Sequence, residues 1–136
     1  MKQDKNFIFD KIKCNILIVD DSKTINNVLT KKFKTNGYTT FNAYNLFEAR
    51  EIIKQNEIHY LILDINLPDG KGYDLLDELK DYSIKVFILT SQKDEEKREF
   101  SFKKGIIDFI IKDSILFQKI EQIIEMIEKL EKNKNE

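Results

Sequence analysis

The chain has little of what builds secreted or membrane proteins. One cysteine, Cys14, among 136 residues excludes an internal disulfide and a metal site made of several cysteines. We interpret Cys14 as a small apolar residue that opens a strand. The apolar runs are far shorter than the roughly 20 residues of a membrane-spanning helix, and the first residues, MKQDKNFIFDKIK, lack the apolar core of a signal peptide. We therefore expect a cytoplasmic protein that makes no membrane contact.

The chain also lacks an excess of either charge. Lys and Arg total 23, Asp and Glu total 24, and the net charge is −1, so no overall field attracts nucleic acid. A phosphate-binding GxxxxGK[ST] loop is missing, and no internal repeat is visible. The single histidine, His59, argues against a histidine phosphotransfer module, and we expect it to be structural.

Two kinds of segment alternate along the sequence. Short segments rich in β-branched and aromatic residues indicate five buried strands: 14–20, 39–43, 59–63, 84–90 and 107–111. Between and after them, apolar residues at helical spacing, or mainly charged residues, indicate helices: 25–36, 46–56, 72–81, 93–104 and 116–130. Strands joined by helical crossovers form a parallel sheet covered on both faces, so we predict a single α/β domain.

Polar residues follow the carboxyl ends of four of these strands. Asp20 and Asp21 end the first strand, Asp64 follows the third, Thr90 ends the fourth, and Lys112 follows the fifth. In a parallel sheet these ends meet at one edge. Two carboxylates about 5 Å apart repel by roughly 3 kcal/mol at an effective dielectric constant of about 20. The three acids therefore need a proton or a cation, and oxygen ligands alone favour Mg²⁺.

A simpler interpretation exists for some of these residues. Asp20 or Asp21 could cap the helix that starts in DDSK, because an aspartate before a helix often accepts its first backbone hydrogen bonds. Capping by one aspartate is compatible with metal binding by the other. Gly70 and Gly72 are interpreted as turn glycines that follow Asp64.

The ordered set Asp20, Asp21, Asp64, Thr90 and Lys112 resembles the receiver domain of two-component response regulators. The segment LDINLPDGKG also resembles the family's loop after the phosphoacceptor, with its proline and second glycine at the family's spacing. The resemblance covers residues 13–131, with residues 1–12 as an extension and 132–136 as a polar tail or the start of a linker. It implies a flavodoxin-like, doubly wound (βα)5 fold with strand order 2-1-3-4-5.

The resemblance also implies a chemistry. Asp64 would accept a phosphoryl group from a sensor histidine kinase or phosphotransfer protein, and Lys112 would neutralise charge on the phosphoryl oxygens. Asp20, Asp21, Asp64 and the backbone carbonyl of Asn66 would hold Mg²⁺. The domain would then be a phosphoacceptor switch with slow self-catalysed phosphorylation and dephosphorylation, not a conventional enzyme.

The switch implied by the family involves Thr90 and Phe109. The Thr90 hydroxyl would turn toward the phosphoryl group and Phe109 would follow it inward, which would reshape the face formed by residues 93–104, the fifth strand and the last helix. A homodimer through that face is one expected outcome. The chain departs from the family where Asp113 replaces the usual proline after Lys112, and where Phe109 replaces the commoner tyrosine.

Three alternatives remain open from the sequence. A receiver-like module could serve in protein contacts without being phosphorylated. A phosphatase using Asp64 would need a second acid nearby, where the chain has Asn66. The domain could also be the N-terminal receiver of a larger regulator such as a diguanylate cyclase. The segments VDDSK and IIKDS resemble those of receivers that are joined to diguanylate cyclase domains.

Overall fold

The main element of the fold is a five-stranded parallel sheet with strand order β2-β1-β3-β6-β7. The computed structural model describes residues 10–91 and 106–134. Its sheet strands are β1 (Asn15–Val19), β2 (Thr39–Ala43), β3 (Tyr60–Asp64), β6 (Lys85–Thr90) and β7 (Ile106–Ile111). Numbered within the sheet, this order is the predicted 2-1-3-4-5, so the fold class is confirmed. The helix predicted over 93–104 lies outside the described residues.

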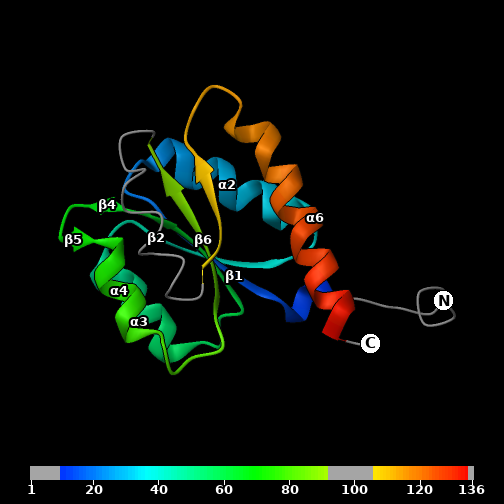
Figure 1. The fold of residues 1–136 in the computed structure, drawn as a ribbon, viewed down its shortest axis with the longest axis horizontal. Coiled ribbons are helices and arrows are strands. Elements are labelled where there is room, and N and C mark those ends of the chain that lie inside the picture. Colours follow the sequence, from blue (N-terminus) through cyan, green and yellow to red (C-terminus); the bar gives the residue numbers. More distant parts are fainter. Residues whose placement is uncertain (1–9, 92–105, 135–136) are drawn as a thin grey trace, which may run out of the picture.

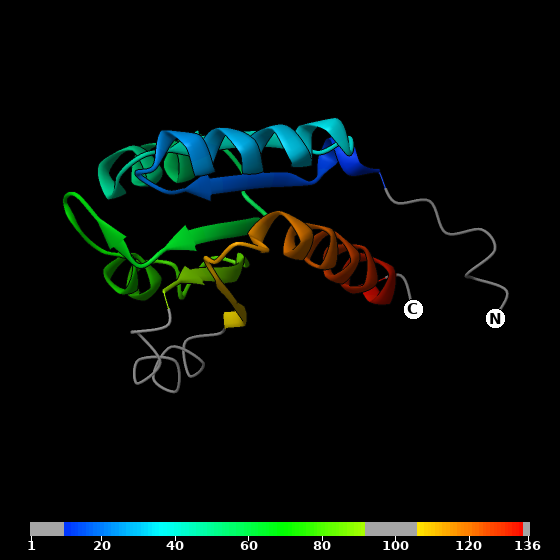
Figure 2. The same ribbon diagram turned by 90° about the horizontal axis from the view of Figure 1, so that it is seen from above.

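Helices cover both faces of the sheet. Figure 1 shows the strands between one pair of helices, α2 (Lys23–Thr35) and α6 (Leu116–Lys134), and a second pair, α3 (Leu46–Gln55) and α4 (Gly72–Glu78). Figure 2 shows that the blue start and the red end of the described chain lie on the same side of the molecule. Both ends of the described chain therefore lie away from the carboxyl ends of the strands.

The alternation of side chains along each strand explains the two layers. Leu61 and Leu63 of β3 pack in the cluster that contains α3 and α4, whereas Tyr60 and Ile62 pack in the cluster that contains α2 and α6. Successive side chains of a strand point to opposite faces. Since both faces are covered, β3 is buried along its whole length, which matches its unbroken apolar sequence.

The first helix of the sheet's α2–α6 face begins at a serine cap. The Ser22 hydroxyl accepts a hydrogen bond from the backbone N–H of Ile25 at 3.3 Å, as N-cap residues do. Neither Asp20 nor Asp21 is therefore the cap of α2, which leaves both carboxylates for other partners. At the other end of α2, Gly37 adopts φ +98°, a left-handed conformation that favours glycine.

The last helix extends beyond its predicted range. It runs through Lys134 and is held at its far end by the Tyr60 hydroxyl, which donates to Glu131 at 2.6 Å, and by the Lys11–Glu128 ion pair at 2.9 Å. Its apolar stripe packs on the sheet, as predicted. Within the described residues, no helix is both long and apolar enough to span a membrane.

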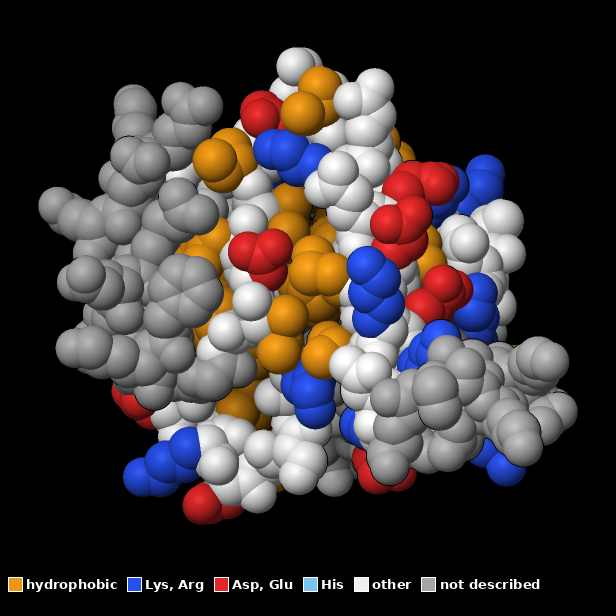
Figure 3. Space-filling view, turned by 45° about the vertical axis from the view of Figure 1, so that its right-hand side comes forward, with side chains coloured by type: hydrophobic (Ala, Val, Ile, Leu, Met, Phe, Trp, Pro, Cys, Tyr) orange, Lys and Arg blue, Asp and Glu red, His pale blue; other side chains and the backbone are white. Residues whose placement is uncertain are grey.

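Two short elements have no counterpart in the sequence predictions. A 3-10 turn, η1 (Lys11–Lys13), precedes β1, and a small antiparallel hairpin, β4 (Asn66–Leu67) with β5 (Gly70–Lys71), follows β3. The space-filling view in Figure 3 shows acidic and basic side chains interspersed around apolar ones on the visible face. This mixture agrees with the near-zero net charge and gives that face no field of one sign.

Candidate functional site

The carboxylates of Asp20, Asp21 and Asp64 converge at the carboxyl edge of the sheet. One ligand atom from each residue lies within 4.8 Å of the others. The convergence follows from the pairing of β1 with β3, in which Val19 is the register partner of Leu63, so each strand delivers its acid immediately afterwards. The three acids are thus gathered as the sequence predicts for a parallel sheet.

Lys112 brings a positive charge to the same place. Its backbone N–H donates to the carbonyl of Thr90 at 2.9 Å. This hydrogen bond extends the pairing of β7 with β6 by one residue beyond the end of β7. Its ammonium lies 3.0 Å from Asp20 Oδ2 and 3.3 Å from Asp64 Oδ2. The side chain therefore bridges carboxylates from two strands across the edge of the sheet.

The three acids differ in their exposure to solvent. Asp20 is 0% exposed and Asp64 is 6% exposed, whereas Asp21 is on the surface. Asp20 Oδ1 accepts a hydrogen bond from the backbone N–H of Ser22 at 2.8 Å. Its Oδ2 faces the Lys112 ammonium but receives no hydrogen bond of regular geometry from the described residues.

Burial changes the protonation of the site. Burial and, after it, the neighbouring Asp20 charge raise the pKa of the Asp64 carboxyl to about 6, while Lys112 opposes the rise. Burial would lower the pKa of the Lys112 ammonium, yet the Asp64 and Asp20 carboxylates together raise it. Lys112 therefore remains charged at neutral pH, whereas burial and the Asp20 charge oppose the ionisation of Asp64.

This donor set suits a hard divalent cation. The buried Asp20 Oδ2 without a hydrogen bond and the clustered carboxylate oxygens are oxygen ligands of the kind that Mg²⁺ prefers, with no cysteine or histidine among them. A single ammonium balances only part of the charge of three carboxylates. The acidic cluster could therefore hold a metal ion.

The remaining predicted site residues surround this cluster. Thr90 is buried and directly follows Leu89, the register partner of Asp64; its hydroxyl donates to the Ser91 carbonyl at 2.9 Å. Phe109 is 6% exposed and packs in the core cluster on the α3–α4 side. Asn66 is exposed in β4, where its side-chain oxygen accepts a hydrogen bond from the Lys71 ammonium.

Sequence reasoning missed two polar residues that support the edge. Asn26 of α2 is completely buried, and its amide donates to the carbonyls of Asp20 at 2.9 Å and Ala43 at 2.8 Å. Asp69, between β4 and β5, accepts hydrogen bonds from the backbone N–H groups of Leu46 at 2.8 Å and Phe47 at 3.0 Å. Asn26 could have been found from the sequence, because it is an asparagine at an inward position of an amphipathic helix.

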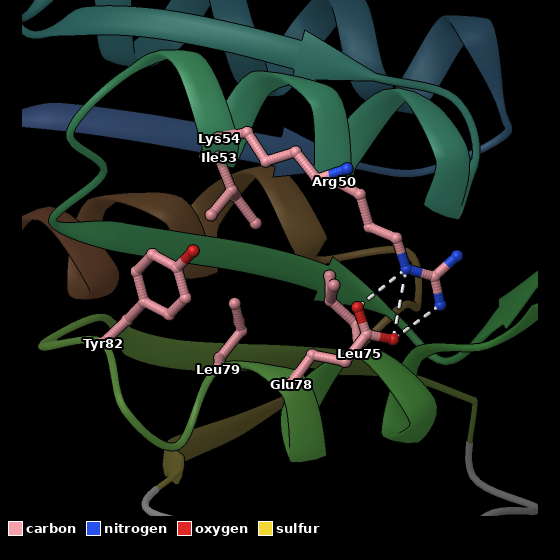
Figure 4. A pocket seen from close by; sticks show the side chains of 7 residues that line it. All are labelled: Arg50, Ile53, Lys54, Leu75, Glu78, Leu79 and Tyr82. Carbon is pink, nitrogen blue, oxygen red and sulfur yellow. Dashed lines mark hydrogen bonds and ion pairs between the residues drawn. The ribbon is translucent and has the colours of Figure 1, made fainter.

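A groove between α3 and α4 lies apart from the carboxylates. Figure 4 shows the Arg50 guanidinium and the Glu78 carboxylate meeting across it, with Tyr82 at its other end. Arg50 Nε lies 2.9 Å from one Glu78 oxygen, and a terminal guanidinium nitrogen lies 2.8 Å from the other. The groove has a volume of about 100 Å³ and contains none of the predicted site residues, and the ion pair joins α3 to α4 across it.

Comparison with known families agrees with this geometry. Residues 16–128 match the model of the response regulator receiver domain, and the chain belongs to this family. A receiver domain is a phosphoacceptor signalling module of two-component systems rather than a conventional enzyme.

Relatives of known sequence and structure share the domain. The aerobic respiration control protein ArcA of Escherichia coli is 32% identical over 99 residues, which cover 72% of this chain and 42% of that protein. A CheY-like response regulator receiver domain protein from Methanospirillum hungatei has a TM-score of 0.78 and 28% identity, over 88% of this chain and 98% of that one. The beryllofluoride-activated NtrC4 receiver domain dimer has a TM-score of 0.70 and 28% identity, over 82% and 97%. The chain spans about two fifths of the length of the curated relative ArcA.

Proposed function

We propose that this domain accepts a phosphoryl group on Asp64 from a sensor histidine kinase or phosphotransfer protein, in a reaction that requires Mg²⁺. The observation that carries the proposal is the meeting of three carboxylates within 4.8 Å with an ammonium 3.0 and 3.3 Å from two of them. Membership of the receiver family supports it.

Asp64 is the nucleophile in this proposal. One oxygen of its carboxylate forms a bond to phosphorus, the bond between phosphorus and the donor's imidazole nitrogen breaks, and that nitrogen keeps the electron pair. Burial and the neighbouring Asp20 charge raise the pKa of Asp64, and the ionised carboxylate is more basic for that reason, which favours attack. Lys112 shifts from neutralising the carboxylates to neutralising the phosphoryl oxygens, so catalysis is chiefly positioning and electrostatics.

The metal site of the proposal consists of Asp20, Asp21, Asp64 and the backbone carbonyl of Asn66. When bound, Mg²⁺ supplies positive charge that offsets repulsion between the acids and the incoming phosphoryl oxygens. Asp20 is already fixed by the Ser22 N–H and by Lys112, whereas Asp21 reaches the site from the surface.

Thr90 and Phe109 are the proposed response to phosphorylation. The Thr90 hydroxyl, which donates to the Ser91 carbonyl, would donate to the phosphoryl group instead, and Phe109 would repack behind it. The change would reach partners through the face that includes β7 and α6. The NtrC4 receiver is a dimer when activated by beryllofluoride, and we propose a phosphorylation-dependent dimer as one output of this chain.

The decisive test is incubation with acetyl phosphate, a small phosphoryl donor, followed by intact-mass measurement. The wild-type protein should gain one phosphate only when Mg²⁺ is present. Asp64→Asn should abolish the adduct because an amide is a poor nucleophile, and Asp21→Ala should suppress it through the metal site. Asp113→Asn is the matched control, because Asp113 is an exposed acid next to Lys112 that pairs with Lys119 at 3.0 Å; it should react like the wild type.

Two results would overturn the proposal. One is an adduct of equal yield on the Asp64→Asn protein. The other is no adduct on the wild type with either acetyl phosphate or a competent kinase, in which case a module acting through protein contacts alone takes its place.

A further inference from the structure

We infer that Asn26 is a positioning residue that fixes Asp20 in the metal-binding orientation and thereby sets the affinity of the site for Mg²⁺. This inference rests on the proposed function. It concerns a residue on α2 whose side chain does not belong to the carboxylate cluster, yet whose amide contacts the backbone of one member directly.

The Asn26 amide donates hydrogen bonds to the backbone where the pairing of β1 with β2 ends. The pairing of β1 with β2 ends at Val19 and Ala43, and it is continued by one hydrogen bond from the Asp20 N–H to the Ala43 carbonyl at 3.1 Å. Beyond that point, Asn26 Nδ2 donates to the carbonyls of Asp20 and Ala43 at 2.9 and 2.8 Å. The amide therefore supplies a donor to the Asp20 carbonyl, which lies past the end of the β1–β2 pairing, and a second donor to the Ala43 carbonyl.

The orientation of the amide is determined by its surroundings. Its nitrogen faces two carbonyl oxygens, and its oxygen accepts a hydrogen bond from the Thr30 hydroxyl at 3.2 Å. Asn26 is 0% exposed, and a buried amide is tolerated when its hydrogen bonds are made. A leucine would suit this buried position on the apolar face of the helix. We therefore attribute the asparagine to its hydrogen bond with the Asp20 backbone.

Asp20 is consequently held at four atoms. Its N–H and carbonyl are fixed by Ala43 and Asn26, its Oδ1 by the Ser22 N–H at 2.8 Å, and its Oδ2 by Lys112 at 3.0 Å. With the backbone fixed, Oδ2 lies beside the same Lys112 ammonium as Asp64 Oδ2. Loss of the amide would release the Asp20 carbonyl, and the carboxylate would then reach the metal only after paying an ordering cost.

The test compares Mg²⁺ binding by isothermal titration calorimetry in the wild type, Asn26→Ser and Asn26→Ala. Partners that orient metal ligands typically change affinity by about 10- to 100-fold, so Asn26→Ala should weaken Mg²⁺ binding by about tenfold or more. Asn26→Ser keeps a short donor and should lie between the two, which also preserves the test if Asn26→Ala does not fold.

A second readout reports the geometry of Asp20 without activity. The amide proton of Ser22 donates to Asp20 Oδ1, so its NMR chemical shift should move in both Asn26 variants. The matched control is Leu29→Ala, because Leu29 is buried on the same helix and packs in the core. It should lower thermal stability while leaving the Mg²⁺ affinity within about twofold and the Ser22 shift unchanged.

The outcomes separate this inference from the proposed function. If the wild type binds no Mg²⁺ and forms no adduct, the proposed function fails. If the wild type does both, and Asn26→Ala or Asn26→Ser binds Mg²⁺ as tightly as Leu29→Ala does, the proposed function stands and Asn26 has only a structural role.

Discussion

Asp64 carries an energetic cost in the metal-free protein, because its carboxyl is buried beside Asp20. Its pKa is raised from an ordinary value of 3.8 to about 6, so the folded state binds the proton more tightly than the unfolded state does. The cost is absent well below pH 3.8, develops as the pH rises from 3.8 to about 6, and is complete above pH 6. A shift of this size corresponds to about 3 kcal/mol.

Replacing Asp64 by asparagine should therefore change the pH profile of stability. In EDTA, the free energy of unfolding of Asp64→Asn relative to the wild type should increase by about 2 kcal/mol between pH 4 and pH 7.5. Urea denaturation at several pH values measures the difference. Asp81→Asn, an exposed acid after α4, is the control and should show a nearly flat difference. A flat difference for Asp64→Asn would contradict the assigned direction of the shift.

Gly72 lies where the backbone after Asp64 leaves no room for a side chain. A Cβ at this position would lie 2.6 Å from the carbonyl oxygen of Asp64 and 3.3 Å from Cα of Ile65. The Gly72 N–H also donates to the Ile65 carbonyl at 2.7 Å. The glycine is thus required by close approach of two backbone segments, and its neighbour is the proposed phosphoacceptor.

Gly72→Ala should lower both stability and phosphorylation. Overpacking of this kind costs about 1–3 kcal/mol, and the shift it forces on Asp64 should slow adduct formation with acetyl phosphate. Gly37→Ala is the matched control, since its φ of +98° makes alanine strained while its Cβ would meet only Lys11 at 3.6 Å. It should lose about 1–2 kcal/mol and keep the wild-type phosphorylation rate. Equal rates in the two variants would exclude the proposed displacement of Asp64.

The elements that surround the site are tied together by polar contacts from outside their own sequence. Asp69 accepts two backbone hydrogen bonds at the start of α3, in addition to the local cap, where Asn45 Oδ1 accepts from the Glu48 N–H at 2.8 Å. The hydrogen bond from Leu46, with that from Phe47, lowers the pKa of the Asp69 carboxyl. The hairpin that follows Asp64 is thereby anchored to α3.

Asp69→Ala should destabilise the protein by about 1 kcal/mol, as removal of a helix cap does. The contribution is present above the unfolded pKa of 3.8 and is lost as the pH falls through the lower folded value. The difference in stability between variant and wild type should therefore be present at pH 7 and shrink in acid below pH 3.8. Thermal unfolding at pH 7 and in acid measures it, with Asp81→Ala as control. A difference that persists in acid would show that the carboxylate charge is not what holds α3.

Long elements were predictable from sequence, and short ones were not. The strand Thr39–Ala43 has the predicted bounds, because its residues favour extended structure, and α6 follows the apolar stripe from Leu116, because that stripe is buried on the sheet. The two-residue strands β4 and β5 are too short for any periodicity, so they depend on the turn at Pro68 and Asp69 that joins them. The cap at Ser22 was missed because aspartate and serine are comparably good N-caps.

The candidate site could be predicted because its residues stand at strand ends, whereas the role of Asn26 could not be predicted because Asn26 does not. Asp20, Asp64, Thr90 and Lys112 each stand at the end of a strand, where chain order and sheet topology bring them to one edge. Asn26 acts through the backbone of Asp20, and a contact of a side chain with a carbonyl depends on three-dimensional packing. Sequence reasoning recognises residue types at strand ends but has no comparable rule for such contacts.

At the scale of the whole molecule, the site is a local concentration of negative charge in a nearly neutral protein. The net charge is −1, yet two of the three clustered acids are buried, with Lys112 as the cation between them. A ligand that binds the folded state alone stabilises it by mass action. Global stability should therefore report occupation of this one edge of the sheet.

Added Mg²⁺ should accordingly raise the free energy of unfolding. Well above the dissociation constant, each tenfold increase in Mg²⁺ should add about 1.4 kcal/mol, because the unfolded chain does not hold Asp20, Asp21 and Asp64 together. Urea titrations at constant ionic strength, with NaCl replacing MgCl₂, measure the effect and separate it from general screening. The double variant Asp20→Asn/Asp64→Asn removes both buried acids and should show no dependence on Mg²⁺, while Asp113→Asn should retain the wild-type slope. The same slope in the double variant and the wild type would place Mg²⁺ binding elsewhere and remove the metal from the proposed site.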